Sequence, residues 1–373
     1  MTSKLFDLMH MAQKVAVMLI CALALVACGS DGDGSGDDGS SQPKNENKNP
    51  ASGYDTNKTS LKAAQRTEFP HINKPSGNYY VIVHTVSGVG NQYTYAGKQY
   101  TYDADGINFC TIWDKDKKSQ LCSCYQLHRS YGGSHNRVIG LTYPADEDLP
   151  MAYRIDDYMR GSGFQHGHIL PQTERTFSYD ANRQTNYLTN MQPQYPQFNG
   201  FDDKDNSHTG LWLLMENKVQ KLAKNLGASD TLFVCKGGTI QNNQVLMKIK
   251  SKMIVPKYFF MAVLKKSSSG TYHAFGFWTE HLNSYVPSNT DLKQYALSIS
   301  ELEKKTGMDF FCNLPDNIEN EVEKKKLIFQ PLLIHPSKQA CSDFSGQALH
   351  YDPTLHFFIK HHKKVTLNIL NLS

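Results

Sequence analysis

The sequence predicts an α+β fold in which a mixed or antiparallel central sheet is flanked by helices. Three observations indicate this class: short runs rich in β-branched and aromatic residues, an amphipathic helical pattern between them, and a composition that supports a packed core. The 373 residues are 39% hydrophobic, 11% aromatic and 20% charged, which excludes a wholly disordered, collagenous or coiled-coil chain. The formal net charge of +4 is too small to identify nucleic acid or an acidic membrane as a partner by itself.

Four segments have the composition of strands and are bounded by Gly, Asn or Ser. They span residues 78–85, 231–235, 253–264 and 271–279. Between the first two, apolar residues recur at helical spacing over residues 211–226, and Gly227 is placed to end the helix. A second helix is expected to begin at Ser300, because Ser300 and Glu303 have the spacing of a capping box, and to end at Gly307.

The first 27 residues have the pattern of a lipoprotein signal peptide. Lys4 and Lys14 precede an apolar run over residues 15–27 that is too short to cross a bilayer as a finished helix. The run ends in Leu-Val-Ala before Cys28, which resembles the bacterial lipobox, whose cysteine is lipidated and becomes the mature N-terminus. We therefore expect an exported lipoprotein, attached to a membrane through a lipid on Cys28, at the outer membrane, on the cell surface or facing the periplasm. The alternative is an ordinary secretory signal with an incidental cysteine.

Polar sequence separates this signal from the first predicted strand. Residues 29–41 are almost entirely Gly, Ser and Asp, so residues 28–76 are expected to form a flexible tether, and residues 77–325 the folded domain. Residues 326–373 carry five lysines and five histidines. The sequence assigns this extension no role: an accessory strand or loose extension is the simpler interpretation, and a membrane or nucleic-acid contact is the alternative.

Six cysteines follow Cys28, an even number that allows disulfides in an exported protein without fixing their pairing. They are Cys110, Cys122, Cys124, Cys235, Cys312 and Cys341. A zinc site at Cys122 and Cys124 is the rival interpretation. Only one residue separates these two cysteines, and no second pair lies nearby, which argues against zinc.

Residues 161–216 contain the side chains most suited to catalysis. His166 and His168 on an extended segment would point to one side, which suits a metal pair, but no third ligand stands out. One His acting as a base is simpler, because a neutral imidazole accepts a proton near pH 7. Arg175 could hold an anion. Oxygen ligands of the kind that Mg²⁺ prefers are offered by Asn186, Asn190, Asn199, Asp202, Asp203, Asp205 and Glu216. This set indicates metal-assisted hydrolysis of a phosphoester, although Asn- and Asp-rich loops also serve turns.

The same stretch contains four blocks in a fixed order. They are Gly167-His168 with Pro171 and Arg175; NYLTNMQPQ at residues 186–194; Asn199, nine residues after Asn190; and Trp212 with Glu216 on the predicted helix. This ordered pattern resembles the DNA/RNA non-specific endonucleases of the ββα-metal superfamily. The resemblance extends from about residue 78 to residue 315.

The resemblance implies a ββα-metal nuclease core within residues 77–325 and a metal-assisted mechanism. His168 would be the general base that takes a proton from the attacking water. Asn199 would be the one direct protein ligand to Mg²⁺, with Mn²⁺ as an alternative ion. The protein would then be a phosphodiester hydrolase.

The remaining matches imply supporting roles. Glu216 would bind the waters of the metal, and Asn190 would help to orient the site. Arg175 or Arg137 would clamp a non-bridging phosphate oxygen. Because such contacts reach phosphate and sugar and read no base edge, DNA and RNA would both be substrates.

The chain departs from the family signature, because Gln165-His166 replaces its Asp-Arg pair. An imidazole is charged only below a pKa of about 6.5 and offers fewer donors than a guanidinium, so His166 would bind phosphate more weakly. Residues 200–209 also form an insertion, which a surface bulge, an acidic lid or a second cation site would explain. Two hypotheses follow: an active extracellular nuclease, and a catalytically weak or inactive surface lipoprotein that binds nucleic acid.

Overall fold

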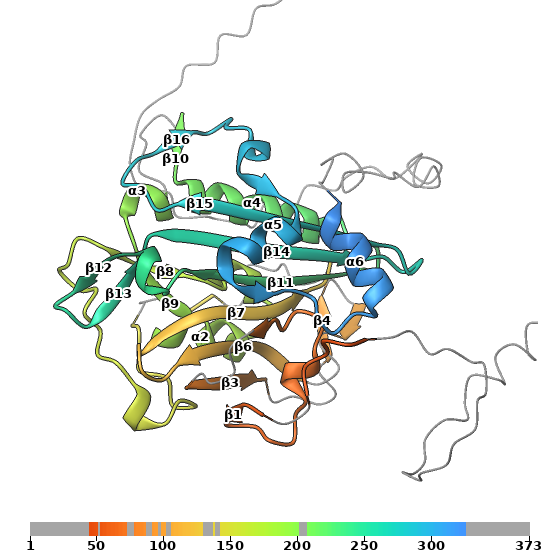
Figure 1. The fold of residues 1–373 in the computed structure, drawn as a ribbon, viewed down its shortest axis with the longest axis horizontal. Helices are drawn as coiled ribbons and strands as arrows, with labels where there is room; N and C mark the ends of the chain where they lie inside the picture. The colour runs from red at the N-terminus through yellow and green to blue at the C-terminus, as the bar shows by residue number, and fades with distance from the viewer. Residues whose placement is uncertain are drawn as a thin grey trace, which may run out of the picture. The chain divides into compact units, whose positions relative to one another are not determined.

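An eight-stranded sheet forms the centre of the computed structural model, in the order β1-β3-β6-β7-β11-β14-β15-β17 (Figure 1). Its strands are β1 (Asp55–Thr56), β3 (Tyr79–Thr85), β6 (Ile107–Asp114), β7 (Ser119–Leu127), β11 (Thr231–Gly238), β14 (Tyr258–Lys266), β15 (Tyr272–Glu280) and β17 (Ala296–Leu297). β1 pairs with β3 in parallel, and the other neighbours in the sheet are antiparallel. The predicted α+β class with a mixed central sheet is confirmed.

The structure describes residues 45–50, 53–72, 78–86, 92–95, 98–101, 106–129, 137–138, 142–200 and 207–325. The predicted signal peptide, the lipid site at Cys28, the extension at residues 326–373, and Asp202, Asp203 and Asp205 lie outside the described residues. No helix in the described ranges is both long enough and apolar enough to cross a bilayer.

Helices and two-stranded ribbons surround the sheet. The helices are α2 (Tyr179–Gln184), α3 (Pro196–Asn199), α4 (Leu211–Lys224), α5 (Ile299–Thr306) and α6 (Asp316–Lys324). The ribbons pair β2 (His71–Ile72) with β18 (Met308–Asp309), β4 (Gln92–Tyr95) with β5 (Lys98–Thr101), β8 (Gln165–His168) with β9 (Met191–Gln194), β10 (His208–Thr209) with β16 (Val286–Pro287), and β12 (Val245–Ile249) with β13 (Met253–Pro256).

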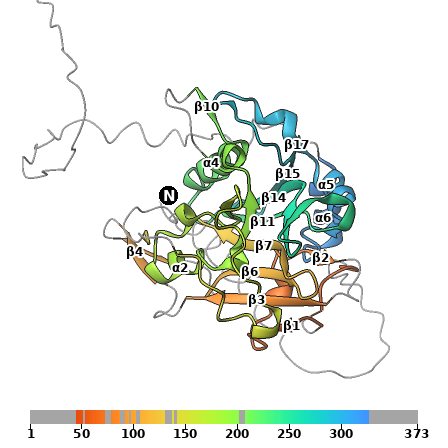
Figure 2. The same ribbon diagram turned by 90° about the vertical axis from the view of Figure 1, so that its left-hand side faces the viewer.

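The sheet separates two apolar layers, because successive side chains of a strand point to opposite faces. On β14, Phe259 and Met261 belong to one layer, while Phe260 and Ala262 belong to the other. Helix α4 packs in the first layer, and α5 and α6 pack in the second, so helices cover both faces (Figure 2). The candidate catalytic residues lie on the α4 side of the sheet.

The predicted helices form, with corrections at two termini. The helix predicted over residues 211–226 is α4, which ends at Lys224 with Asn225 as its C-cap, two residues before the predicted end, and its core-facing residues are buried. The second helix begins two residues before the predicted start: Ser298 is its N-cap and forms the capping box with Glu301. Glu303, the predicted partner, accepts instead from the Phe310 backbone N–H, 3.0 Å away. Gly307 ends this helix with φ 74°, as its placement predicts.

The predicted tether is shorter than residues 28–76, because the chain from Asn45 onward belongs to the compact unit. The Asn45 amide donates to the Leu314 carbonyl at 2.6 Å, and the Asn49 backbone N–H donates to Asn313 at 3.1 Å. β1 and β2 also lie within the predicted tether. Hydrogen bonds to distant residues therefore anchor a stretch whose composition alone indicates disorder.

The predicted strand at residues 253–264 is two strands, because the chain leaves one ribbon and enters the central sheet between Pro256 and Tyr258. The other three predicted strands correspond to β3, β11 and β15. The five described cysteines that follow the signal are buried, and Cys122, Cys124, Cys235 and Cys312 are free thiols. The Cys124 sulfur lies 3.8 Å from that of Cys122 and 3.6 Å from that of Cys235, so these three thiols meet in the core.

Candidate active site

A hairpin followed by a helix positions the candidate site. β8 pairs with β9, and the chain then passes through α3 into α4. His166 and His168 alternate with Gly167 along β8 and therefore point to one side. A Cβ on Gly167 would lie 2.3 Å from the side chain of Gln194, which packs over this glycine and would have to move for a larger residue. The unit has the ββα order that the resemblance implies.

The insertion at residues 200–209 leaves the helix geometry intact, because its two ends meet. The backbone N–H of Gly210 donates to the Gly200 carbonyl at 2.8 Å. A Cβ on Gly210 would lie 2.5 Å from the Phe198 carbonyl oxygen, which explains the glycine at the start of α4. Asn199 at the end of α3 is thereby kept next to α4.

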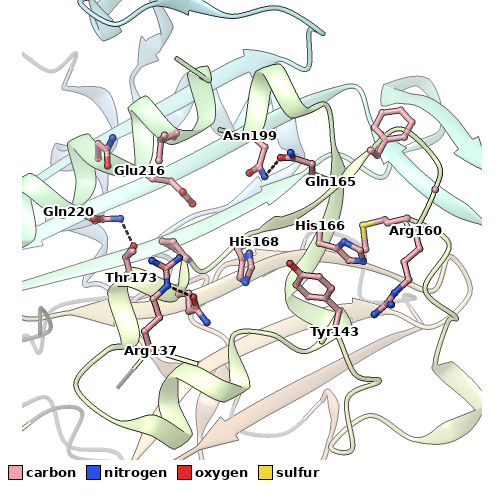
Figure 3. Close-up of a pocket in the computed structure, with 17 residues that line it drawn as sticks. Arg137, Tyr143, Arg160, Gln165, His166, His168, Thr173, Asn199, Glu216 and Gln220 are labelled. Carbon is pink, nitrogen blue, oxygen red and sulfur yellow. Dashed lines mark hydrogen bonds between the residues drawn. The ribbon is translucent and has the colours of Figure 1, made fainter. Parts of the chain in front are cut away.

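A pocket of about 650 Å³ lies over this unit (Figure 3). Its walls include Arg137, Tyr143, Arg160, His168, Asn199 and Glu216. In Figure 3, Asn199 and Glu216 approach the pocket from one side, and Arg137 and Tyr143 approach it from the other. The pocket therefore brings an imidazole, oxygen ligands and guanidinium groups together.

His168 is held in one tautomer. Its Nε2 lies 3.1 Å from Oδ1 of Asn186. Since that oxygen can only accept, Nε2 carries the proton and Nδ1 keeps a lone pair. Burial lowers the pKa of His168 to about 4, so the ring is neutral at physiological pH and able to accept a proton.

Asn199 is oriented by the residue that replaces the signature carboxylate. Its Nδ2 donates to Oε1 of Gln165 at 2.9 Å. This bond leaves the Asn199 Oδ1 available in a pocket that Glu216 also lines. An amide oxygen with a carboxylate nearby is a hard donor set, which fits Mg²⁺ and suits soft metals poorly.

Glu216 lies between the pocket and a buried lysine. Nζ of Lys236 is 2.8 Å from Oε1 of Glu216, with side-chain exposures of 1% and 9%. Burial raises the pKa of Glu216, and the ammonium of Lys236 opposes that rise. The same ammonium lies 4.8 Å from the ring centre of Trp212. The lysine thus favours the ionised form of this carboxylate.

Asn190 positions the backbone around His168 and is itself fully buried. Its Nδ2 donates to the carbonyls of Leu170 and Thr185, at 2.9 and 2.8 Å. Its Oδ1 accepts from the Leu170 backbone N–H at 2.9 Å. Trp212, fully buried on α4, donates from its indole to the His168 carbonyl at 3.2 Å. Both residues hold the backbone around His168, which is compatible with the orienting role predicted for Asn190.

The phosphate-clamping role predicted for Arg175 is wrong. The side chain is 1% exposed and does not line the pocket. Its guanidinium donates to the side chain and carbonyl of Asn108, at 2.7 and 3.0 Å, and to the Gln126 carbonyl at 3.2 Å. Arg137, the alternative, does line the pocket, and its Nε donates to Gln172 at 2.8 Å.

The surroundings of His166 do not favour its positively charged form. Its Nε2 lies 2.9 Å from Oδ1 of Asp157, and its ring stacks on Tyr143 with centres 3.8 Å apart. Burial lowers the pKa of His166 below its ordinary value, although Asp157 opposes this. The ring is therefore mostly neutral at pH 7, and phosphate binding as an imidazolium is not favoured. Arg160, which is 65% exposed, carries the permanent charge on this side of the pocket.

The described residues also give no support to a histidine metal pair. No third His, Cys or carboxylate gathers with His166 and His168 in the part of the chain that the structure describes. Each ring already uses one nitrogen, toward Asp157 or toward Asn186. The single-base interpretation of His168 fits the geometry better.

Three functional neighbours were missed from the sequence. Asp157 and Arg160 form an ion pair at 2.8 Å just before β8, and their opposite charges three residues apart were an available signal. Lys236 follows the apolar run of β11, and a lysine at the end of such a run indicates a buried partner. The partner itself, Glu216, cannot be deduced from the pattern.

Comparisons with known proteins identify related nucleases. The sequence model described as DNA/RNA non-specific endonuclease matches residues 86–317, more than half of the chain. A protein named Nuclease from Nostoc sp. is 29% identical over 224 residues, which cover 58% of this chain and 76% of that protein. Nuclease C1 from Cunninghamella echinulata var. echinulata is 28% identical over 179 residues, covering 46% and 67% of the two chains.

Two further similarities are more distant. Human mitochondrial Endonuclease G is 26% identical over 174 residues, covering 42% of this chain and 51% of that protein, so the match spans about half its length. A solved structure of the EndoG/EndoGI complex gives a TM-score of 0.47 at 16% identity, covering 62% of this chain and 90% of that one. On the family match over residues 86–317, the chain belongs to the DNA/RNA non-specific endonuclease family of metal-dependent nuclease hydrolases.

Proposed function

We propose that the chain is a Mg²⁺-dependent endonuclease that hydrolyses phosphodiester bonds of extracellular DNA and RNA. One observation carries the proposal: a neutral histidine in a fixed tautomer shares a pocket with an oriented amide oxygen and a carboxylate. These are the groups that metal-assisted attack of water on phosphorus requires.

His168 is the general base in this proposal. Its Nδ1 lone pair accepts a proton from the water that attacks phosphorus, while Asn186 holds Nε2–H and keeps the ring in place. Asp157, which lies near β8, is bonded to His166 and Arg160 and not to His168. The lowered pKa also favours return of the proton once the bond has broken.

Asn199 would hold the metal through its Oδ1, and Glu216 would hold it through bound water. When bound, Mg²⁺ offsets the negative charge that builds on the phosphate and the departing oxygen. Gln165 fixes the Asn199 amide, and Lys236 pairs with Glu216 and favours its ionised form, so both side chains are oriented by protein contacts.

Arg137 and Arg160 bind the non-bridging oxygens of the substrate. A guanidinium is always charged and presents a planar fork that matches phosphate. Both guanidinium groups contact the phosphates of the nucleic acid and no base, which would allow cleavage of both DNA and RNA. The expected lipid on Cys28 would place this chemistry outside the cell.

A comparison of the wild-type chain with His168→Ala tests the proposal. Wild type should cleave plasmid DNA and total RNA with Mg²⁺ and not with EDTA. His168→Ala should lose about 10²- to 10⁴-fold in rate while still binding nucleic acid, because only the proton transfer is removed. His166→Ala is the matched control, and a full loss there with His168→Ala unaffected would overturn the assignment. Binding without cleavage by the wild-type chain would favour the alternative of an inactive nucleic-acid-binding lipoprotein.

A further inference from the structure

A lysine-rich hairpin stands beside the pocket. β12 and β13 pair antiparallel, with Ile249 opposite Met253, and residues 250–252 form the tip. Lys250 and Ser251 have φ of 47° and 59°, the left-handed conformation that a tight reversal of this kind needs. The turn leaves Lys248, Lys250 and Lys252 exposed on one projecting element.

These lysines form no ion pair with an acidic side chain of the described ranges, whereas Arg160, His166 and Lys236 near the pocket are paired. Lys250 and Lys252 instead lie 5.6 and 5.4 Å from the ring centre of Tyr158. Nζ of Lys252 also donates to the Tyr158 hydroxyl at 3.1 Å. The tip therefore gathers two ammonium groups around one aromatic ring, whose hydroxyl donates to Asp156 at 2.9 Å, and Lys248 adds a third exposed lysine on β12.

The hairpin is continuous with the pocket wall. Ile249 and Met253 pack in one apolar cluster with Met159, and Tyr158 and Phe164 pack against the same cluster. Met159, Arg160 and Phe164 line the pocket. Figure 1 shows β12 and β13 beside β8 and β9 at one end of the molecule. The hairpin therefore lies next to the wall of the pocket in which we propose that the phosphate binds.

We propose that this hairpin, with Tyr158, is a second phosphate-binding surface that holds the nucleic-acid backbone beyond the cleaved bond. The inference rests on the proposed function and extends it to binding outside the pocket. Nucleic acid is the favoured occupant because the lysine charges continue from Arg160, which already lines the pocket where the phosphate binds. Lysines act as point charges on phosphates, and each such pairing releases counterions from the polymer. The surface provides affinity without sequence preference.

The salt dependence of binding tests this surface. The full-length chain with Lys248→Gln, Lys250→Asn and Lys252→Gln is compared with wild type on a short fluorescent duplex in EDTA, where cleavage does not interfere. Asparagine is chosen at position 250 because it tolerates positive φ. The plot of log affinity against log salt should flatten by about 0.9 for each phosphate that the variant no longer neutralises, and affinity near 0.1 M salt should fall roughly tenfold for each such phosphate.

A matched control removes three exposed lysines from the other side of the sheet: Lys62→Gln, Lys304→Gln and Lys324→Gln. Their elements pack in the apolar layer that faces away from the pocket. The control has the same net charge as the hairpin variant and should keep the wild-type slope. Hydrolysis of bis(p-nitrophenyl) phosphate with Mg²⁺, a substrate that fills only the pocket, should be unchanged in the hairpin variant.

Three outcomes separate the surface from the proposed function. Equal slopes for wild type and the hairpin variant would overturn the surface, whether or not wild type cleaves. A flattened slope with no cleavage by wild type would support the surface and overturn the proposed nuclease activity. Unchanged duplex binding with loss of binding to phosphatidylserine vesicles would overturn the surface in favour of a membrane contact.

Discussion

Lys236→Met removes the charge that favours the ionised form of Glu216. Methionine retains the length and apolar stem of the lysine, so the packing against Trp212 is largely kept while the ammonium is removed. Glu216 would then be buried without its partner, 2.8 Å from where the ammonium had been. Since burial already raises the pKa of Glu216, the variant should raise it further.

The expected cost is about 3–5 kcal/mol of unfolding free energy at neutral pH, the range for removing one partner of a buried ion pair. A carboxyl whose folded pKa lies above its unfolded value destabilises the protein above the unfolded pKa, and the penalty disappears as both states become protonated. The deficit should therefore shrink toward pH 4.5. Lys325→Met is the control, because Lys325 and Glu321 are 57% and 64% exposed and such pairs contribute about 0–1 kcal/mol.

Urea unfolding followed by circular dichroism, at about pH 8 and about pH 5, measures these differences. The double variant Lys236→Met with Glu216→Gln should recover most of the missing stability, because no buried charge is left alone. The single variant should also need more Mg²⁺ for half-maximal cleavage. A single variant as stable as wild type at both pH values, or a double variant as unstable as the single, would refute the reasoning.

Three other predictions follow from the structure and the sequence. Asn199→Ala should raise the Mg²⁺ concentration for half-maximal cleavage, while a requirement for Zn²⁺ with Mg²⁺ inert would contradict the assignment. Burial raises the pKa of Glu319 to about 8 and that of Glu323 to about 9, so the stability of the protein should fall as the pH rises from about 4.5 to 9. In thermal unfolding, Glu323→Gln should make this fall less steep, and an unchanged pH profile would contradict the prediction. Cys28→Ser should release the protein from the membrane fraction or stall its processing, and normal membrane association would remove the lipoprotein proposal.

The central fold was predictable because its signals are local and periodic. The apolar spacing of α4 and the β-branched strands survive without knowledge of their partners. The start of α5 could not be predicted, because Ser298 and Ser300 each precede a glutamate by three residues. Burial of Ile299 decides between them, because that side chain is fully inside the core as the first helical residue. Tertiary packing, absent from the pattern, made the choice.

The catalytic candidates divide in the same way. His168, Asn199 and Glu216 were found because their spacing along the chain is the signature itself, and the structure places all three at one pocket. Arg175 was misjudged because sequence gives charge without burial, and its donors are consumed by Asn108 and Gln126. Lys236 was missed because its partner lies 20 residues earlier on another element.

Gln165 and His166 replace the Asp-Arg pair of the signature, and Arg160 supplies a guanidinium at another position in the pocket wall. Gln165 orients Asn199 through a neutral amide. Asp157 and Tyr143 fix His166 as part of the wall, and Asp157 also carries Arg160. In the proposed mechanism the exposed guanidinium of Arg160 binds the phosphate, and its side chain loses rotamer freedom when it does so. This entropic cost of ordering the arginine is the same for the bound substrate and for the transition state, so it should weaken substrate affinity and leave the proton transfer at His168 unchanged. The proposed phosphate contacts of the lysine hairpin would compensate for the lost affinity.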